Sequence, residues 1–225
     1  MFRPLASLIC LTIALAASPL VAQPATLQEM FESVDPAQIA KEARLRGNPR
    51  RGAIVFYASA AACAKCHVTG EGQSPLGPDL TRLGDKLSDV HLVESLLHPS
   101  KSIRKGYETV QLITIDGEVR SGMMVSEDDE QIVLRDAANL QTNVSIAKDD
   151  IEARLSSKVS MMPAGLVATL KSPREFLDLI SYLFAIHEGG RQRADELQPT
   201  AEQLIPEDDT LNLNHAKIIR RAENG

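Results

Sequence analysis

The stretch "YETVQLITIDGEVRSGMMV", residues 107–125, decides the fold because the hydrophobic pattern changes its period here. On either side, apolar residues recur at helical spacing, whereas within the stretch they alternate with polar residues, as in a half-buried β-strand. Asp116-Gly117 lies in the middle and is a strong signal for a two-residue hairpin turn. The stretch therefore predicts two antiparallel strands between helical regions.

The same alternation continues downstream in "QIVLRD" (131–136) and "TNVSIA" (142–147), and "DIEARL" (150–155) is a further short strand. Five short strands in about 50 residues are typical of a small antiparallel sheet or barrel. Such a segment is much longer than a typical loop of about 4–6 residues. We therefore expect residues 105–155 to be an inserted β-strand module.

The flanking regions predict helices around residues 49–60, 88–97 and 172–187. Each begins after an Asn or Ser that can cap the helix, and in two of them proline follows directly in the first turn. Gly189-Gly190 is expected to stop the last helix.

The two ends of the chain differ from the rest. Residues 1–22 read as a secretory signal peptide, because a basic residue precedes the apolar run 5–17 and small residues follow it. The alternative is a weak membrane anchor, but a span needs about 20 apolar residues. Cys10 is then lost with the signal, and the protein is expected to be periplasmic or otherwise exported. The tail 191–225 is polar and is expected to be extended or partly ordered.

Charge and cysteine content narrow the function. The formal net charge is −6, so nucleic acid and anionic membrane surfaces are poor partners. Of three cysteines, Cys63 and Cys66 remain after Cys10 is removed. They lie in "AACAKCHVTG", residues 61–70, and His67 follows directly.

C-x-x-C-H is the attachment signature of c-type haem. On one helical turn, Cys63 and Cys66 can each form a thioether with a haem vinyl group, and His67 can bind the iron. We expect one covalent haem c per chain.

Three other interpretations of the two cysteines are possible. A C-x-x-C disulfide oxidoreductase would place them after a strand in a βαβ pattern, which does not occur here. A zinc site would need a fourth ligand at suitable spacing. A structural disulfide would leave His67 without a role.

A haem histidine usually donates its second ring N–H to a backbone carbonyl. Pro78, in "GPDL" (77–80), is the candidate acceptor, and its alternative role is that of an ordinary turn proline.

The sixth iron ligand is expected in "VSMMPAGL", residues 159–166. Adjacent side chains in extended backbone point to opposite faces, so only one methionine of the pair can reach iron. The residue before Pro163 is held extended, which favours Met162 over Met161. The alternative is that both fill the core, as we expect for Met123 and Met124. Three histidines are rival ligands: His91, His98 and His187.

With these residues in view, the chain resembles the haem-binding domain family of the Pirellula/Verrucomicrobium type, a branch of class I cytochromes c. The resemblance covers about residues 47–187 in the family's order. It implies that Cys63 and Cys66 attach haem, that His67 is the proximal ligand and that Met162 is the distal one, although the family usually has leucine where Met161 stands. The pieces that carry it are "GNPRRGAIVFYASAAACAKCH", "GPDLTRLG", "LVESLLHPSKSIRKGYETV", "DGEVRSGMMV", "IVLRDA" and "SMMPAGL".

The expected fold class is mainly α, a cytochrome c core of residues 23–104 plus 156–190 with a small antiparallel β-module inserted, which makes the chain α+β overall. The expected function is single-electron transfer from a periplasmic dehydrogenase or membrane complex to another carrier or an oxidase. One rival is a haem enzyme or gas sensor with a displaceable sixth ligand. Another is a binding module in which the sheet docks a partner and haem is structural.

Overall fold

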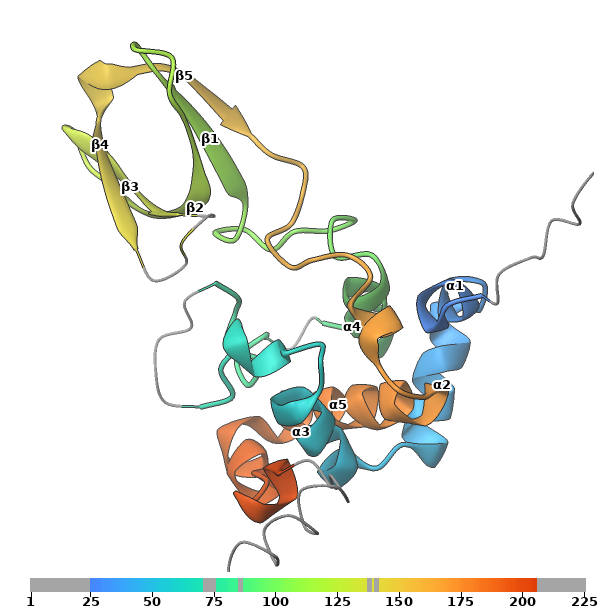
Figure 1. Cartoon of the computed structure of the whole chain (residues 1–225). Coiled ribbons are helices and arrows are strands. Elements are labelled where there is room, and N and C mark those ends of the chain that lie inside the picture. Colours follow the sequence, from blue (N-terminus) through green and yellow to red (C-terminus); the bar gives the residue numbers. More distant parts are fainter. Residues whose placement is uncertain (1–24, 71–75, 85–86, 137–138, 140–141, 206–225) are drawn as a thin grey trace, which may run out of the picture.

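A computed structural model describes residues 25–70, 76–84, 87–136, 139 and 142–205 (Figure 1). The expected signal peptide, with Cys10, and the end of the polar tail lie outside these residues. Within the described part, no helix combines the length and apolar character needed to cross a membrane. The α-helices are α1 (Leu27–Glu32), α2 (Pro36–Arg46), α3 (Pro49–Ala58), α4 (Asp89–Leu97) and α5 (Pro173–Leu197).

The helices begin where their capping residues predict. Asn48 and Ser172 each accept a backbone N–H of the first turn, and proline occupies the first turn of both α3 and α5. Ser88 caps α4 in the same way. These side chains satisfy amide groups that have no partner within the helix. The predicted helix starts are therefore confirmed.

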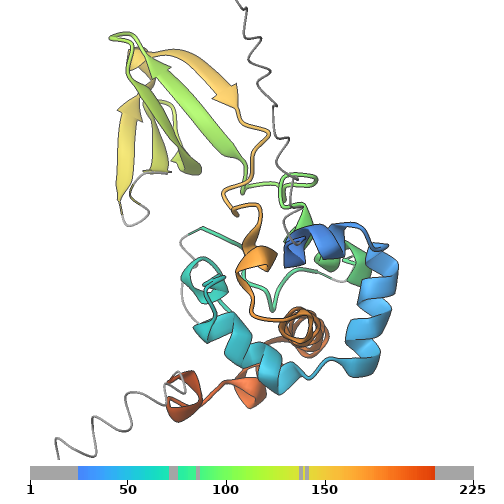
Figure 2. The same cartoon turned by 45° about the vertical axis from the view of Figure 1, so that its right-hand side comes forward.

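The long helix α5 lies at the centre of the helical part, in contact with α2, α3 and α4 (Figure 2). Its buried face carries Phe176, Tyr182 and Phe184, and Phe56 of α3 packs against the Tyr182 ring. Large buried aromatic side chains contribute most of the apolar area of such a core. This core fixes the turn that follows α3, which holds the two cysteines.

The helix break expected at Gly189-Gly190 is confirmed, but a second helical segment follows it within α5. Gly190 has non-helical backbone, with a φ of 58° and a ψ of −152°, so α5 consists of two helical segments joined at a kink, the second of which ends at Leu197. A positive φ costs glycine little, so the chain can bend there without a terminal loop. Ala194 and Leu197 beyond the kink are buried, and their burial keeps this polar segment helical.

The five strands lie where the alternating pattern predicts them, and they form one antiparallel sheet in the order β4-β3-β2-β1-β5. The β1–β2 hairpin turns at Asp116-Gly117, with a φ of 83° at the glycine. The strands are β1 (Thr109–Thr114), β2 (Val119–Glu127), β3 (Gln131–Asp136), β4 (Asn143–Ala147) and β5 (Ile151–Ser156).

The sheet has a hydrophobic core of its own. It consists of buried side chains on β1, β3 and β4, with Val144 and Ile151 packed against them. The helical residues form a separate cluster. The buried members of the sheet cluster are Val110, Leu112, Ile132, Leu134 and Ile146.

The expected fold class is wrong in describing the chain as a mainly α cytochrome c core with the sheet as a small insertion. The described chain is α+β, with a five-stranded antiparallel sheet and one long helix. The sheet is more than an appendage to a helical fold, because its alternating residues bury one face in a second core.

Two segments connect the sheet to the helices, and both are seen between the two parts in Figures 1 and 2. We call residues 98–108 the outgoing connector and residues 157–165 the return connector. Because β1 and β5 pair as antiparallel neighbours, the two connectors leave the sheet together. The Ser157 N–H donates to the carbonyl oxygen of Thr109 at 2.8 Å.

Candidate functional site

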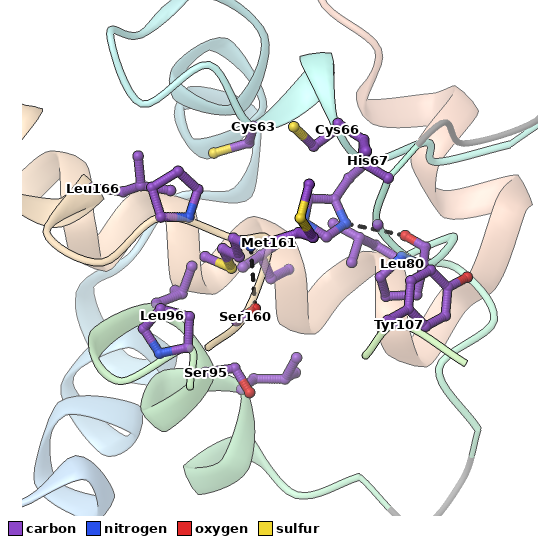
Figure 3. A pocket seen from close by; sticks show the side chains of 18 of the residues that line it. Cys63, Cys66, His67, Leu80, Ser95, Leu96, Tyr107, Ser160, Met161 and Leu166 are labelled. Atoms are coloured by element: carbon purple, nitrogen blue, oxygen red, sulfur yellow. Dashed lines mark hydrogen bonds between the residues drawn. The ribbon is translucent and has the colours of Figure 1, made fainter. Parts of the chain in front are cut away.

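A cavity of about 500 Å³ lies next to the C-x-x-C-H segment. Its walls come from the end of α3, the cysteine turn, α4, both connectors and α5. In Figure 3 the side chains of Cys63, Cys66 and His67 lie on one side of this space, and Ser95 and Leu96 of α4 lie on the other. The site is therefore built from segments that are far apart in the sequence.

The two cysteines and the histidine lie on one tight turn. After α3 the chain turns through Ala62, which has a φ of 52°, into the short 3-10 helix Cys63–Lys65. The amides of Cys66 and His67 both donate to the carbonyl oxygen of Cys63, at 3.1 and 3.0 Å. The expectation of a single helical turn is thus confirmed, and all three side chains line the cavity.

The cysteines are not joined by a disulfide. Burial raises the pKa of the Cys63 thiol to about 11, and it raises the pKa of the Cys66 thiol as well. Because the thiolate is the reactive form in redox and metal chemistry, these surroundings favour inert, protonated thiols. They contrast with the lowered pKa that is typical of disulfide oxidoreductase cysteines.

The His67 ring makes the predicted contact with the carbonyl of Pro78. Its Nδ1 lies 3.1 Å from the Pro78 oxygen. A carbonyl oxygen only accepts, so Nδ1 carries the proton and Nε2 keeps its lone pair. Burial lowers the pKa of His67, which favours the neutral ring. A neutral imidazole with a fixed tautomer is the form that binds a metal ion.

Gly77 is a site residue that sequence reasoning missed. A Cβ on Gly77 would lie 2.4 Å from Cε1 and 2.6 Å from Nδ1 of His67. The Gly77 N–H also donates to the carbonyl oxygen of Cys66 at 2.9 Å. Only glycine lets the backbone approach the imidazole so closely. The signal in the sequence was a glycine directly before the predicted Pro78.

The structure brings both candidate methionines to the cavity. Met161 and Met162 are half-buried and line its wall, and Met161 is labelled in Figure 3. Gly165 follows with a φ of 80° and turns the chain into the 3-10 helix Leu166–Thr169. Because both side chains reach the cavity, the choice of Met162 over Met161 stays a prediction.

The other candidate methionines and histidines differ in whether they line the cavity. Met123 is buried in β2 and Met124 is partly exposed there, and neither is among the cavity residues. His91 on α4 lines the cavity. The remaining two are engaged elsewhere: His98 Nδ1 lies 3.9 Å from a Glu32 carboxylate oxygen, and His187 Nε2 lies 3.3 Å from the Leu87 carbonyl oxygen.

The cavity is mainly apolar, and its charged side chains are basic. Lys65 and Arg104 line it, whereas no aspartate or glutamate is among its described lining residues. Arg104 also donates from Nη1 to the carbonyl oxygen of Leu83 at 2.9 Å. Sequence reasoning missed both cations because nothing in the local pattern links a lysine within the cysteine turn to an arginine on the outgoing connector.

Among the described residues, no group of three or more His, Cys, Asp or Glu side chains is arranged to hold a metal ion. A comparison of the chain with known protein families found no matching family model, and a comparison with curated proteins found no match.

Proposed function

We propose that this protein is an exported monohaem c-type cytochrome that transfers single electrons. The observation that carries the proposal is the arrangement on one cavity of Cys63, Cys66 and a neutral His67 that is held by the Pro78 carbonyl. The resemblance of the sequence to a haem-binding family points the same way.

The residues present fit a haem. The volume of the cavity, about 500 Å³, lies within the range of about 300–1,000 Å³ usual for cofactor sites. Its apolar walls suit a flat, largely apolar macrocycle. Lys65 and Arg104 supply positive charge toward the two carboxylates that haem carries.

Each residue has a distinct role in this proposal. The thiols of Cys63 and Cys66 hold the group covalently, so it cannot be lost by dilution. The Pro78 carbonyl orients the His67 ring and raises its basicity. A methionine thioether from the return connector would supply a second, soft ligand, which would raise the reduction potential. When bound, haem iron supplies the one-electron redox couple.

If His67 and a methionine both bound the iron, no position would be left open for a substrate, so electron transfer would be favoured over substrate turnover. The redox partners that we propose are a periplasmic dehydrogenase or membrane complex on one side and another carrier or an oxidase on the other. A haem enzyme or gas sensor remains the alternative if the methionine is absent from the iron or is displaced.

The test is to produce the full chain, with its leader, in a host that carries the haem-attachment machinery. We expect the pigment to survive denaturation and acid–organic extraction, and the reduced-minus-oxidised spectrum to be that of low-spin haem c. A Cys63→Ala/Cys66→Ala variant is the control and should yield no covalent pigment. Extraction of the pigment from the parent chain, or a disulfide in the peptide that contains residues 63–67, would refute the proposal. High-spin iron at rest would favour the enzyme or sensor.

The methionine ligand is tested in the same protein. Met162→Ala should abolish the sulfur-to-iron charge-transfer band of the oxidised form, lower the potential and admit cyanide. Met161→Leu should keep the band, because Met161 is not the expected ligand. This volume-conserving change usually lowers the free energy of unfolding by less than about 1.5 kcal/mol, so the fold should be retained. The reverse pattern would make Met161 the ligand. Retention of the band in both variants would mean that either methionine can bind the iron, whereas absence of the band from the parent protein would direct attention to His91.

A further inference from the structure

The two connectors of the sheet form part of the cavity wall. The outgoing connector contributes Arg104 and Tyr107, and the return connector contributes Ser160 and both methionines. The segment that brings the methionines to the cavity is thus the same segment that brings the chain back from the sheet.

Two serine hydroxyls link these connectors to the methionines. The Ser160 N–H donates to Ser100 Oγ at 3.1 Å, from one connector to the other. The Met162 N–H donates to Ser160 Oγ, also at 3.1 Å. Together the two hydrogen bonds connect Ser100, which follows α4, through Ser160 to the backbone of Met162.

These two hydrogen bonds affect the orientation of the methionine side chains. The backbone of Met162 is restricted by Pro163, and its amide is held by the Ser160 hydroxyl. Because the Met162 backbone is held on both sides, the directions in which the two methionine side chains can leave it are restricted, and both side chains line the cavity. Ser160 is itself held by Ser100 on the other connector, so loss of either hydroxyl frees the pair to change its orientation.

We propose that Ser100 and Ser160 are positioning residues that hold the methionine pair over the cavity. The proposal rests on the proposed function in that the methionine sulfur is the axial ligand. In this role the serines act through the backbone of the return connector.

The experiment uses the full haem protein and two readouts. The first is the rate at which cyanide replaces methionine on the oxidised iron. The second is hydrogen exchange of the Met162 amide, measured by NMR. Ser160→Ala should raise both rates about five- to tenfold, which corresponds to the loss of one ordinary hydrogen bond. Ser100→Ala should act in the same direction.

Two variants serve as controls. Ser160→Thr keeps the hydroxyl and should restore both rates. Ser157→Ala lies on the same connector but removes a hydroxyl that accepts the Val159 N–H, so it should leave both rates unchanged.

Parent-like rates in Ser160→Ala and Ser100→Ala would overturn the proposal, as would equal acceleration in Ser157→Ala or no rescue by threonine. Failure of the proposed function is seen separately, in a parent chain that carries no covalent haem or no methionine band. The exchange rate of the Met162 amide then still decides whether the serines hold this backbone, and unprotected exchange in the parent would overturn the positioning role.

Discussion

At the scale of single residues, the approach of Gly77 to His67 is the tightest constraint on the site. Gly77→Ala would place a Cβ 2.4 Å from the imidazole, so the ring or the loop must move. We expect a loss of about 1–3 kcal/mol in the free energy of unfolding, as for other overpacked sites. Denaturant unfolding followed by circular dichroism measures it, and the yield of covalent haem should fall as well.

Gly70→Ala is the matched control for Gly77, because the nearest atoms to its added Cβ are 3.9 Å away. It should unfold like the parent. An equal loss in both variants would mean that the loop tolerates no alanine anywhere, and the contact with His67 would then not be the cause.

Cys63 provides a prediction on pH for the chain before haem is attached. Alkylation needs the thiolate, and burial raises the pKa of this thiol from 9.0 to about 11. At pH 8 the thiolate fraction is therefore about 100-fold lower than in the unfolded chain. We expect Cys63 in reduced, haem-free protein to react with iodoacetamide correspondingly more slowly.

The reaction rate at Cys63 should keep rising up to about pH 11 in the folded chain and level off near pH 9 in urea. Mass spectrometry of the peptide that contains residue 63 follows the modification. The same pH midpoint in urea and in buffer would contradict burial of the thiol.

At the scale of elements, the contact of α3 with α5 aligns the cysteine turn. Asp178 on α5 is buried and accepts a forked pair of bonds from Arg51, at 2.6 and 2.9 Å. It also accepts the Asn48 N–H at the start of α3, at 2.7 Å. A Cβ at Gly52 would lie 1.9 Å from the Asp178 carbonyl oxygen, so the two helices are in direct backbone contact.

Arg51→Met should cost about 1.5–3 kcal/mol, because it leaves a buried carboxylate with fewer donors. Arg50→Met, one position away on the same helix, should cost less than about 0.5 kcal/mol, since Arg50 makes only a long bond of 3.5 Å to the Glu196 carbonyl oxygen. Chemical denaturation compares the two. Similar losses would show that Asp178 does not depend on its arginine.

Elements were predictable where a local signal decides them. Asn48-Pro49 and Ser172-Pro173 start helices by local capping, and Asp116-Gly117 makes its hairpin by local backbone preference. The double glycine predicted the break in α5, but the helical segment beyond it was not predictable, because Ala194 and Leu197 are buried there. That burial depends on tertiary contacts, which a local pattern does not contain.

Some residues of the candidate site could likewise be predicted from the local sequence, and others could not. The C-x-x-C-H spacing and the contact of His67 with Pro78 follow from short stretches of sequence, and the structure has both the turn and the hydrogen bond. Arg104 and Ser100 could not be predicted as site residues, since their places depend on how the connectors fold back onto the helices.

At the scale of the whole molecule, two hydrophobic cores explain why the expected fold class failed. The sequence pattern located the strands, but we interpreted them as an insertion in a mainly α fold. In the structure the strands have their own cluster of buried hydrophobic residues, which is separate from the helical cluster. An α+β protein in which each part has its own core can lose one part more readily than a protein with a single core.

Removal of the sheet is therefore the prediction at this scale. Residues 109–156 would be replaced by a Gly-Ser linker between residue 108 and Ser157. The geometry permits this because the Ser157 N–H and the Thr109 carbonyl oxygen are 2.8 Å apart, so the two cut ends are neighbours. Ser100, Ser160 and the methionine pair all stay in the chain.

We expect the shortened protein to attach haem covalently and to keep a low-spin spectrum, because the buried helical cluster contains no strand residue. If the sheet docks a redox partner, the rate of reduction by that partner should fall while the rate with a small chemical reductant stays unchanged. Loss of low-spin haem on removal of the sheet would show instead that the connectors need the sheet to hold the methionines over the cavity. In that case the two cores would act as one functional unit, although their buried residues are separate.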